Sequence, residues 1–144
     1  MKITTRGRYA VMALVSLAGA SRGHPVSIRG IAREEEISEQ YLQQLFARLR
    51  RQNLVKSVRG PGGGFILARH PSEITIGEVI RSAEGKEPRV GCRSSGRKCG
   101  MIERCRTQNM WEALESMMDE FLDSITVEEL AAAGRVRERG RAGA

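Results

Sequence analysis

Apolar residues near the N-terminus recur every three or four positions, which is the spacing of a helix that buries one face. They are Ala10, Ala13, Leu14, Leu17 and Ala18. A Gly-His-Pro sequence at residues 23–25 then interrupts the pattern. The spacing therefore predicts a first helix that ends before residue 23.

Two shorter helices are predicted next, separated by a tight turn. Ser27 can cap the first, which ends around residues 34–36, and Ser38 can cap the second. One face of the second helix is apolar, with Leu42, Leu45, Phe46 and Leu49. Its other face carries amides and arginines, with Gln40, Gln44, Ala47, Arg48 and Arg51. This arrangement describes a helix-turn-helix.

Two short apolar segments, 54–58 and 65–68, follow the second helix and are joined by a glycine-rich sequence. The pattern predicts a β-hairpin, and a hairpin in this position is the wing of a winged helix. Glycines at its tip would let the backbone approach a groove wall, while Arg59 could enter a narrow minor groove. The sequence GPGGG lacks the Lys-Ser/Thr of a nucleotide-binding loop and does not open a helix.

The second half of the chain predicts further helices around a loop. Capping boxes at residues 75–78 and 126–129 each open a helix, and Gly85 ends the first of these. Residues 86–99 lack apolar periodicity. An apolar seam then runs for two heptads, enough for a helix that packs on a partner. It consists of Trp111, Leu114, Met118, Phe121 and Ile125.

The predicted fold class is mostly α with a small β-hairpin. Residues 1–71 would form a winged helix-turn-helix DNA-binding domain, and residues 72–130 a cysteine loop with dimerisation helices. The tail, residues 131–144, contains mainly Ala, Gly and Arg with almost no apolar anchor, so we expect it to be disordered.

Positive charge is concentrated in the N-terminal half. Residues 1–70 carry 12 Lys and Arg against 4 acidic residues, net +8, while residues 71–144 carry 12 against 13, net −1. A domain at +8 indicates a polyanionic partner, with nucleic acid the first candidate and a membrane surface the second. The predicted DNA contacts are Arg6, Arg8, Ser38, Gln40, Tyr41, Gln43, Gln44, Arg48, Arg59 and Gly60.

Other functional classes find little support. No apolar run approaches the roughly 18 residues of a membrane span, and the apolar start of the chain has helical spacing rather than the pattern of a signal peptide. We therefore expect a cytoplasmic, reducing compartment. His24 and His70 have no acidic residues paired with them, and no catalytic set or nucleotide fingerprint is present, so an enzyme is not predicted.

All three cysteines, Cys92, Cys99 and Cys105, lie in one segment with the spacing C-x6-C-x5-C. Structural zinc sites favour C-x2–4-C knuckles and four ligands, which this segment lacks. Surrounding cations should lower the pKa of the thiols and would offset the charge of a thiolate-bound cluster. On the residues alone, an iron–sulfur cluster, zinc and redox thiols all remain open.

Several segments together resemble the dimeric winged-helix iron–sulfur regulators, the family that includes IscR, NsrR and RirA. They are residues 2–10, 41–46, 58–64, 76–80, the cysteine segment and residues 111–130. The resemblance implies a homodimeric regulator on a pseudo-palindromic operator, whose DNA binding depends on an iron–sulfur cluster, [2Fe–2S] in IscR. It also implies control of genes for cluster assembly or iron homeostasis, and a scaffold protein as cluster donor.

Four departures from IscR bear on the cluster and on DNA choice. Gln108 stands where IscR has a histidine ligand, so it becomes the candidate fourth ligand. Arg8 occupies the place of an acidic ligand that some relatives borrow from the partner. The first cysteine gap is one residue longer, which makes [4Fe–4S] the alternative cluster. Gln43 replaces a frequent Glu, which favours a cluster that gates affinity rather than operator class.

Overall fold

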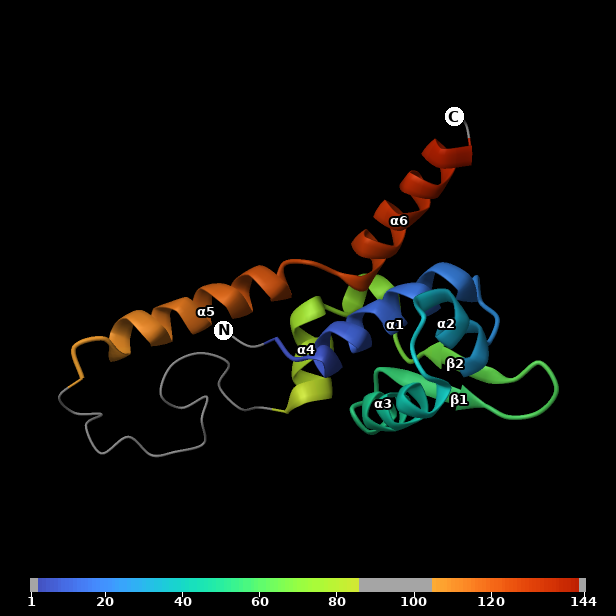
Figure 1. The fold of residues 1–144 in the computed structure, drawn as a ribbon, viewed down its shortest axis with the longest axis horizontal. Coiled ribbons are helices and arrows are strands. Elements are labelled where there is room, and N and C mark those ends of the chain that lie inside the picture. The colour runs from blue at the N-terminus through green and yellow to red at the C-terminus, as the bar shows by residue number, and fades with distance from the viewer. Residues whose placement is uncertain (1–2, 86–104, 143–144) are drawn as a thin grey trace.

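The computed structural model describes residues 3–85 and 105–142. Along the described chain lie α1 (Thr5–Ser21), α2 (Ile28–Glu35), α3 (Glu39–Arg51), β1 (Val55–Val58), β2 (Gly64–Leu67), the 3-10 helix η1 (Pro71–Glu73), α4 (Ile76–Glu84), α5 (Gln108–Asp123) and α6 (Val127–Ala142). The predicted fold class, mostly α with a small hairpin, is confirmed. Figure 1 shows α1 to α4 and the hairpin packed together, with α5 and α6 extending away from them.

One hydrophobic core unites the winged helix-turn-helix. The predicted stripe of α1 is buried except for Ala18, which is half-buried, and the apolar face of α3 packs against it. The ring of Phe46 lies 4.8 Å from that of Phe65, centroid to centroid. Helix α3, the recognition helix of the predicted helix-turn-helix, therefore shares this core with the wing. Val79 and Ile80 from α4 and Val127 from α6 join the same cluster, so the core extends beyond residue 71.

The turn between α2 and α3 follows from its sequence. Ser27 accepts a hydrogen bond from the Gly30 amide at 3.1 Å, which caps the start of α2. Glu36 ends α2 in the left-handed region, with φ 54°. Ser38 then accepts one from the Tyr41 amide at 3.1 Å and caps α3. Both predicted caps are confirmed, and together they set where the two helices begin.

The wing is an antiparallel hairpin in which Val55 pairs with Leu67 and Val58 with Gly64. Its second strand also bonds to the loop before α2. Val26 and Phe65 exchange two backbone hydrogen bonds of 2.9 and 2.8 Å. This third backbone segment holds the wing in a fixed place beside the helix-turn-helix.

The C-terminal tail differs from the expectation of disorder. Helix α6 runs from Val127 to Ala142, because alanine and arginine favour helix and because its first turn is well capped. Thr126 donates its backbone N–H to Glu129 Oε2 at 2.8 Å, and the Glu129 amide donates to Thr126 Oγ1 at 3.2 Å. This reciprocal capping box was predicted; the length of the helix that it starts was not. Within the described residues, no helix has the length and apolar character needed to cross a membrane.

Candidate DNA interface and cysteine segment

The outer face of α3 presents three amides to solvent. Gln40, Gln43 and Gln44 are all exposed, while Leu42 and Leu45 on the opposite face are buried. Helical spacing places the three amides side by side, where each could pair with an adenine edge in a major groove. The structure therefore brings together the residues that sequence reasoning proposed for base readout.

Two other candidates on α3 already have structural roles. The Ser38 hydroxyl oxygen accepts the Tyr41 amide, as described above. The Tyr41 ring is half-buried and meets the Tyr9 ring edge to face, with centroids 5.8 Å apart. Their contribution to DNA binding stays a prediction, but each is placed by contacts within the protein.

Arg48 lies on the outer face of α3 and is exposed, yet its guanidinium reaches across to another helix. Its Nη1 donates to the carbonyl oxygen of Ala83 at 3.5 Å. That carbonyl belongs to the last turn of α4, where backbone acceptors lack partners within the helix. The sequence indicated only a phosphate or base contact for Arg48, and this link to α4 was missed.

The wing presents Arg59 and Gly60 to solvent. The tip is a tight turn in which Gly60 and Gly62 have φ of 102° and 74°, values that favour glycine. The Gly63 amide closes it by donating to the Gly60 carbonyl at 2.9 Å. The glycines are thus needed to form the turn, whereas the sequence interpretation assigned them to close approach toward a groove.

Arg6 and Arg8 are exposed in the first turns of α1. The start of this helix is held by a distant residue. The backbone N–H and the hydroxyl of Thr4 both donate to Glu84 Oε1, each at 2.7 Å. No sequence pattern points to this pair, because 80 residues separate its members.

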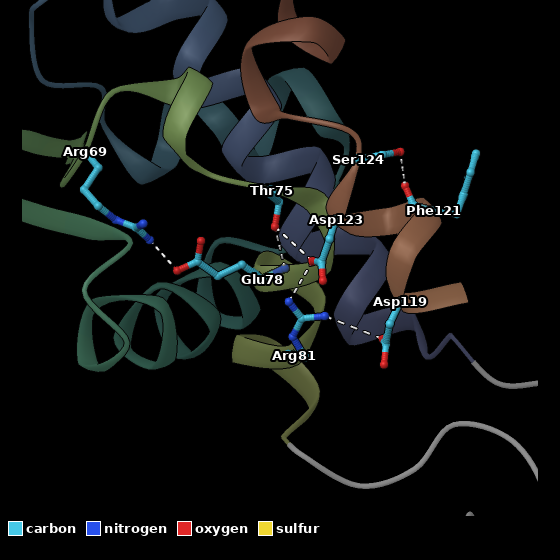
Figure 2. A network of polar contacts seen from close by, with 8 residues as sticks. All are labelled: Arg69, Thr75, Glu78, Arg81, Asp119, Phe121, Asp123 and Ser124. Atoms are coloured by element: carbon cyan, nitrogen blue, oxygen red, sulfur yellow. Dashed lines mark hydrogen bonds and ion pairs between the residues drawn. The ribbon is translucent and has the colours of Figure 1, made fainter. Parts of the chain in front are cut away.

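A network of ion pairs joins α4 to the elements on either side (Figure 2). Arg81 lies between two carboxylates of α5, with Nη2 2.7 Å from Asp123 Oδ1 and Nη1 3.5 Å from Asp119 Oδ1. On the wing side, Glu78 pairs with Arg69, which follows β2. Helix α4 therefore connects the wing to the C-terminal end of α5.

Of the three cysteines, only Cys105 lies within the described residues; Cys92 and Cys99 lie outside them. Cys105 Sγ is 3.3 Å from the Thr107 hydroxyl oxygen. Hydrogen bonds from the Thr107 hydroxyl, then from the backbone amides of Thr107 and Gln108, lower the pKa of the Cys105 thiol. For this cysteine the cause of the lowered pKa is a local hydrogen-bonding turn, whereas the sequence pointed to nearby cations.

Gln108, the candidate fourth ligand, begins α5 three residues after Cys105. Its side-chain amide donates to Glu112 Oε1 at 2.9 Å, so the amide is held along the helix. In the described part of the chain, which contains one of the three cysteines, no group of three or more His, Cys, Asp or Glu side chains could hold a metal ion.

The Rrf2 family, described as an iron-dependent transcriptional regulator, matches residues 3–133. The chain belongs to the Rrf2 family. It is 41% identical to the HTH-type transcriptional regulator IscR of Pectobacterium atrosepticum, over 90% of this chain and 79% of that protein. It is also 41% identical to IscR of Escherichia coli (strain K12 / DH10B), over 90% of this chain and 80% of that protein.

Solved structures of two regulators have the same fold. CymR, the global cysteine regulator of B. subtilis, superposes with a TM-score of 0.77 at 35% identity, covering 92% of this chain and 98% of CymR. IscR of T. potens gives a TM-score of 0.76 at 39% identity, covering 93% and 88% of the two chains. The protein is thus a transcriptional regulator of the Rrf2 family and not an enzyme, as the sequence indicated.

Proposed function

We propose that the protein is a homodimeric DNA-binding regulator that senses iron–sulfur cluster status through Cys92, Cys99 and Cys105. It would act in the cytoplasm on genes for cluster assembly or iron homeostasis, with a scaffold protein as cluster donor. The observation that carries the proposal is the match to an iron-dependent regulator family over residues 3–133, because this region contains all three cysteines.

Binding to DNA would use two surfaces of the winged helix. The exposed amides of α3 suit base edges in the major groove, and Arg59 on the wing suits the narrow minor groove beside it. Arg6 and Arg8 would contact phosphates, which position the protein without reading sequence. The net charge of +8 over residues 1–70 supports such contacts.

Dimerisation is supported by the surface of α5. No residue of this helix is buried, and Met110, Met117 and Phe121 are 55%, 67% and 65% exposed. An apolar stripe of this kind costs free energy in water and is stabilised by burial against a partner. The opposite edge of α5 contacts α4 through Asp119 and Asp123, so the stripe is free to meet a second copy. Two copies would then read the two halves of a pseudo-palindrome.

The described part of the cysteine segment suits a thiolate-bound cluster. A lowered pKa at Cys105 favours the thiolate, the form that binds iron. Cys92, Cys99 and Cys105 would hold the cluster, which we propose to be [2Fe–2S] with [4Fe–4S] as the alternative, and Gln108 is the candidate fourth ligand. When bound, the cluster would supply a redox-active centre that links separate parts of the cysteine segment.

A second candidate is a cluster-free regulator that uses the same cysteines as a redox or zinc switch. It is favoured by the lowered pKa of Cys105, which also increases reactivity toward oxidants. The likeness to CymR, described as a global cysteine regulator, supports this candidate as well.

The two candidates differ in what the purified protein contains. Protein prepared without oxygen should be coloured, with about two irons and two sulfides per protomer for [2Fe–2S], or about four of each for [4Fe–4S]. Cys99→Ala should lose the colour and the cluster-dependent change in DNA affinity while staying dimeric. Ser95→Ala, in the same segment, is the matched control and should keep both.

A colourless, metal-free wild-type dimer that binds DNA would overturn the cluster proposal. If its DNA affinity then changed reversibly with oxidant and reductant, the thiol switch would replace it. A colourless protein that holds zinc and unfolds with chelator would make the cysteines a structural zinc site.

A further inference from the structure

The chain that follows α5 is bound to the chain that precedes α4 through the backbone. The Ile76 amide donates to the Ile125 carbonyl, and the Val127 amide donates to the Ile74 carbonyl, each at 2.9 Å. The two bonds form a short antiparallel bridge between these segments. Because they lie close together, they fix where α5 ends, while the direction of the helix also depends on side-chain contacts.

Asp123, the last residue of α5, makes such contacts. Its Oδ1 accepts the Thr75 hydroxyl at 3.1 Å and Arg81 Nη2 at 2.7 Å, as Figure 2 shows. A Cβ on Gly77 would collide with the same oxygen, so glycine at this position makes room for the carboxylate. We call these four residues the α4–α5 joint. They hold one carboxylate oxygen at the start of α4, where a larger residue than glycine would displace it.

The rest of α5 extends away from the joint, as Figure 1 shows. Its 16 residues, at a rise of about 1.5 Å each, give a length of about 24 Å. A rotation of about 10° at the joint would move the far end of the helix by about 4 Å, close to the rise of one base pair. A small change in the joint is therefore amplified to a distance that matters for binding to DNA.

We propose that Asp123 is a positioning residue that sets the distance between the two recognition helices of the dimer, and so the half-site spacing that the protein accepts. This inference rests on the proposed dimerisation through α5. Helix α3 shares the core of α4, so the joint places each recognition helix relative to the dimer contact. A two-fold dimer reads half-sites at one separation only if that distance is held constant.

The first test compares operators that differ in half-site spacing. A preferred operator is selected from random-sequence DNA duplexes with protein purified without oxygen, and one base pair is then inserted between its half-sites. The insertion adds about 3.4 Å and turns one half-site by about 35° relative to the other. Wild-type protein should bind the longer operator at least about tenfold more weakly, because both recognition helices can no longer engage together. This ratio of dissociation constants is the spacing penalty.

Asp123→Ala should reduce the spacing penalty to below about threefold and should weaken binding to the original operator, because a loose joint holds no single separation. Asp123→Asn keeps an oxygen acceptor for Thr75 but loses the charge toward Arg81, so its penalty should be intermediate. The matched control is Glu120→Ala, which removes the same charge from an exposed position in the last turn of α5, outside the joint. It should keep the wild-type penalty.

Gly77→Ala tests the joint without removing the carboxylate. The added Cβ must displace Asp123, so this variant should also have a penalty below about threefold. Gly19→Ala on α1 is its matched control, because a Cβ at Gly19 would meet nothing within 4 Å. This control should keep the wild-type penalty.

Analytical ultracentrifugation distinguishes the joint from the dimer contact. The dimer dissociation constants of Asp123→Ala and Gly77→Ala should stay within about twofold of wild type, since the joint lies on the edge of α5 that contacts α4. A wild-type spacing penalty in both variants, or a dimer that dissociates in Asp123→Ala, would overturn the inference. A monomeric wild-type protein would instead contradict the proposed dimer.

Discussion

The winged-helix body, which consists of α1 to α4 and the hairpin, differs from helix α5 in how deeply its apolar residues are buried. In the body, Leu14, Phe46 and Val79 are completely buried. In α5, no residue is buried, and Phe121 is 65% exposed. Both regions have an amphipathic helix with a clear apolar stripe, but only the body contains the surfaces that cover it. The body thus covers its own apolar stripe, while the stripe of α5 stays exposed in the single protomer.

The end of α5 is connected to the body by charge on one edge and by Leu122, which packs against the core of the body. Arg81 on α4 reaches Asp119 and Asp123 on the polar edge of α5. These groups are partly exposed, so each pair stabilises the contact only modestly. Because these contacts lie on one edge of α5, they set the direction of the helix and leave its apolar stripe exposed.

The largest expected effect is a loss of stability when one large side chain is removed from the core of the body. Phe46→Ala removes a ring that is 0% exposed and contacts Phe65, so the free energy of unfolding should fall by about 3–5 kcal/mol. Chemical denaturation followed by circular dichroism measures this loss. A loss below about 1 kcal/mol would mean that the wing and α3 do not share a packed core.

The same substitution in α5 should have a different result. Phe121→Ala removes a ring exposed in the protomer, so protomer stability should change by less than about 0.5 kcal/mol. If α5 forms the dimer, the dimer dissociation constant should rise roughly thirtyfold, the equivalent of about 2 kcal/mol. Analytical ultracentrifugation distinguishes the two effects. An unchanged dimer would place the dimer contact elsewhere.

The smallest effect concerns a carboxylate at the edge of the body. Burial, and then the charge of Glu34, raise the pKa of Glu35 above its ordinary value. The folded state therefore disfavours the ionised form, and this penalty is present at neutral pH and disappears as the pH falls through the pKa of the folded protein. At pH 7, Glu35→Gln should raise the free energy of unfolding by less than about 0.5 kcal/mol. This gain would be measured as a slightly higher melting temperature.

The pH dependence gives this prediction its control. At a pH well below the pKa of Glu35, where its carboxyl is protonated in both the folded and the unfolded protein, wild type and Glu35→Gln should melt together. A difference that persists unchanged from neutral to acid pH would assign the effect to packing rather than to ionisation.

Much of the body could be predicted because its signals are local. Ser27 and Ser38 lie next to the helices that they cap, and a few residues of glycine-rich sequence are enough to specify the wing turn. The amides of α3 could be assigned to an outer face from helical spacing alone. In each case the interacting groups are separated by fewer than about ten residues, so the chain's own geometry brings them together.

The contacts that connect the elements around the candidate site join residues that are far apart in the sequence. Glu84 with Thr4, Arg81 with Asp123 and Arg48 with Ala83 join residues that are 80, 42 and 35 positions apart. No periodicity relates such positions, and Glu84, Arg81 and Arg48 each resemble an ordinary charged surface residue when taken alone. The length of α6 was misjudged for the opposite reason: the absence of apolar residues was given more weight than strong helix propensity.

The sequence by itself determined the helices and the hairpin, the amide face of α3 and the clustering of every cysteine in one segment. These follow from backbone geometry and from the burial of apolar residues at regular spacing. Only the tertiary structure decided that α4 holds the start of α1, the recognition helix and α5 at one turn. Such contacts depend on how helices cross once the core has formed, because only then do distant charges come within hydrogen-bonding distance.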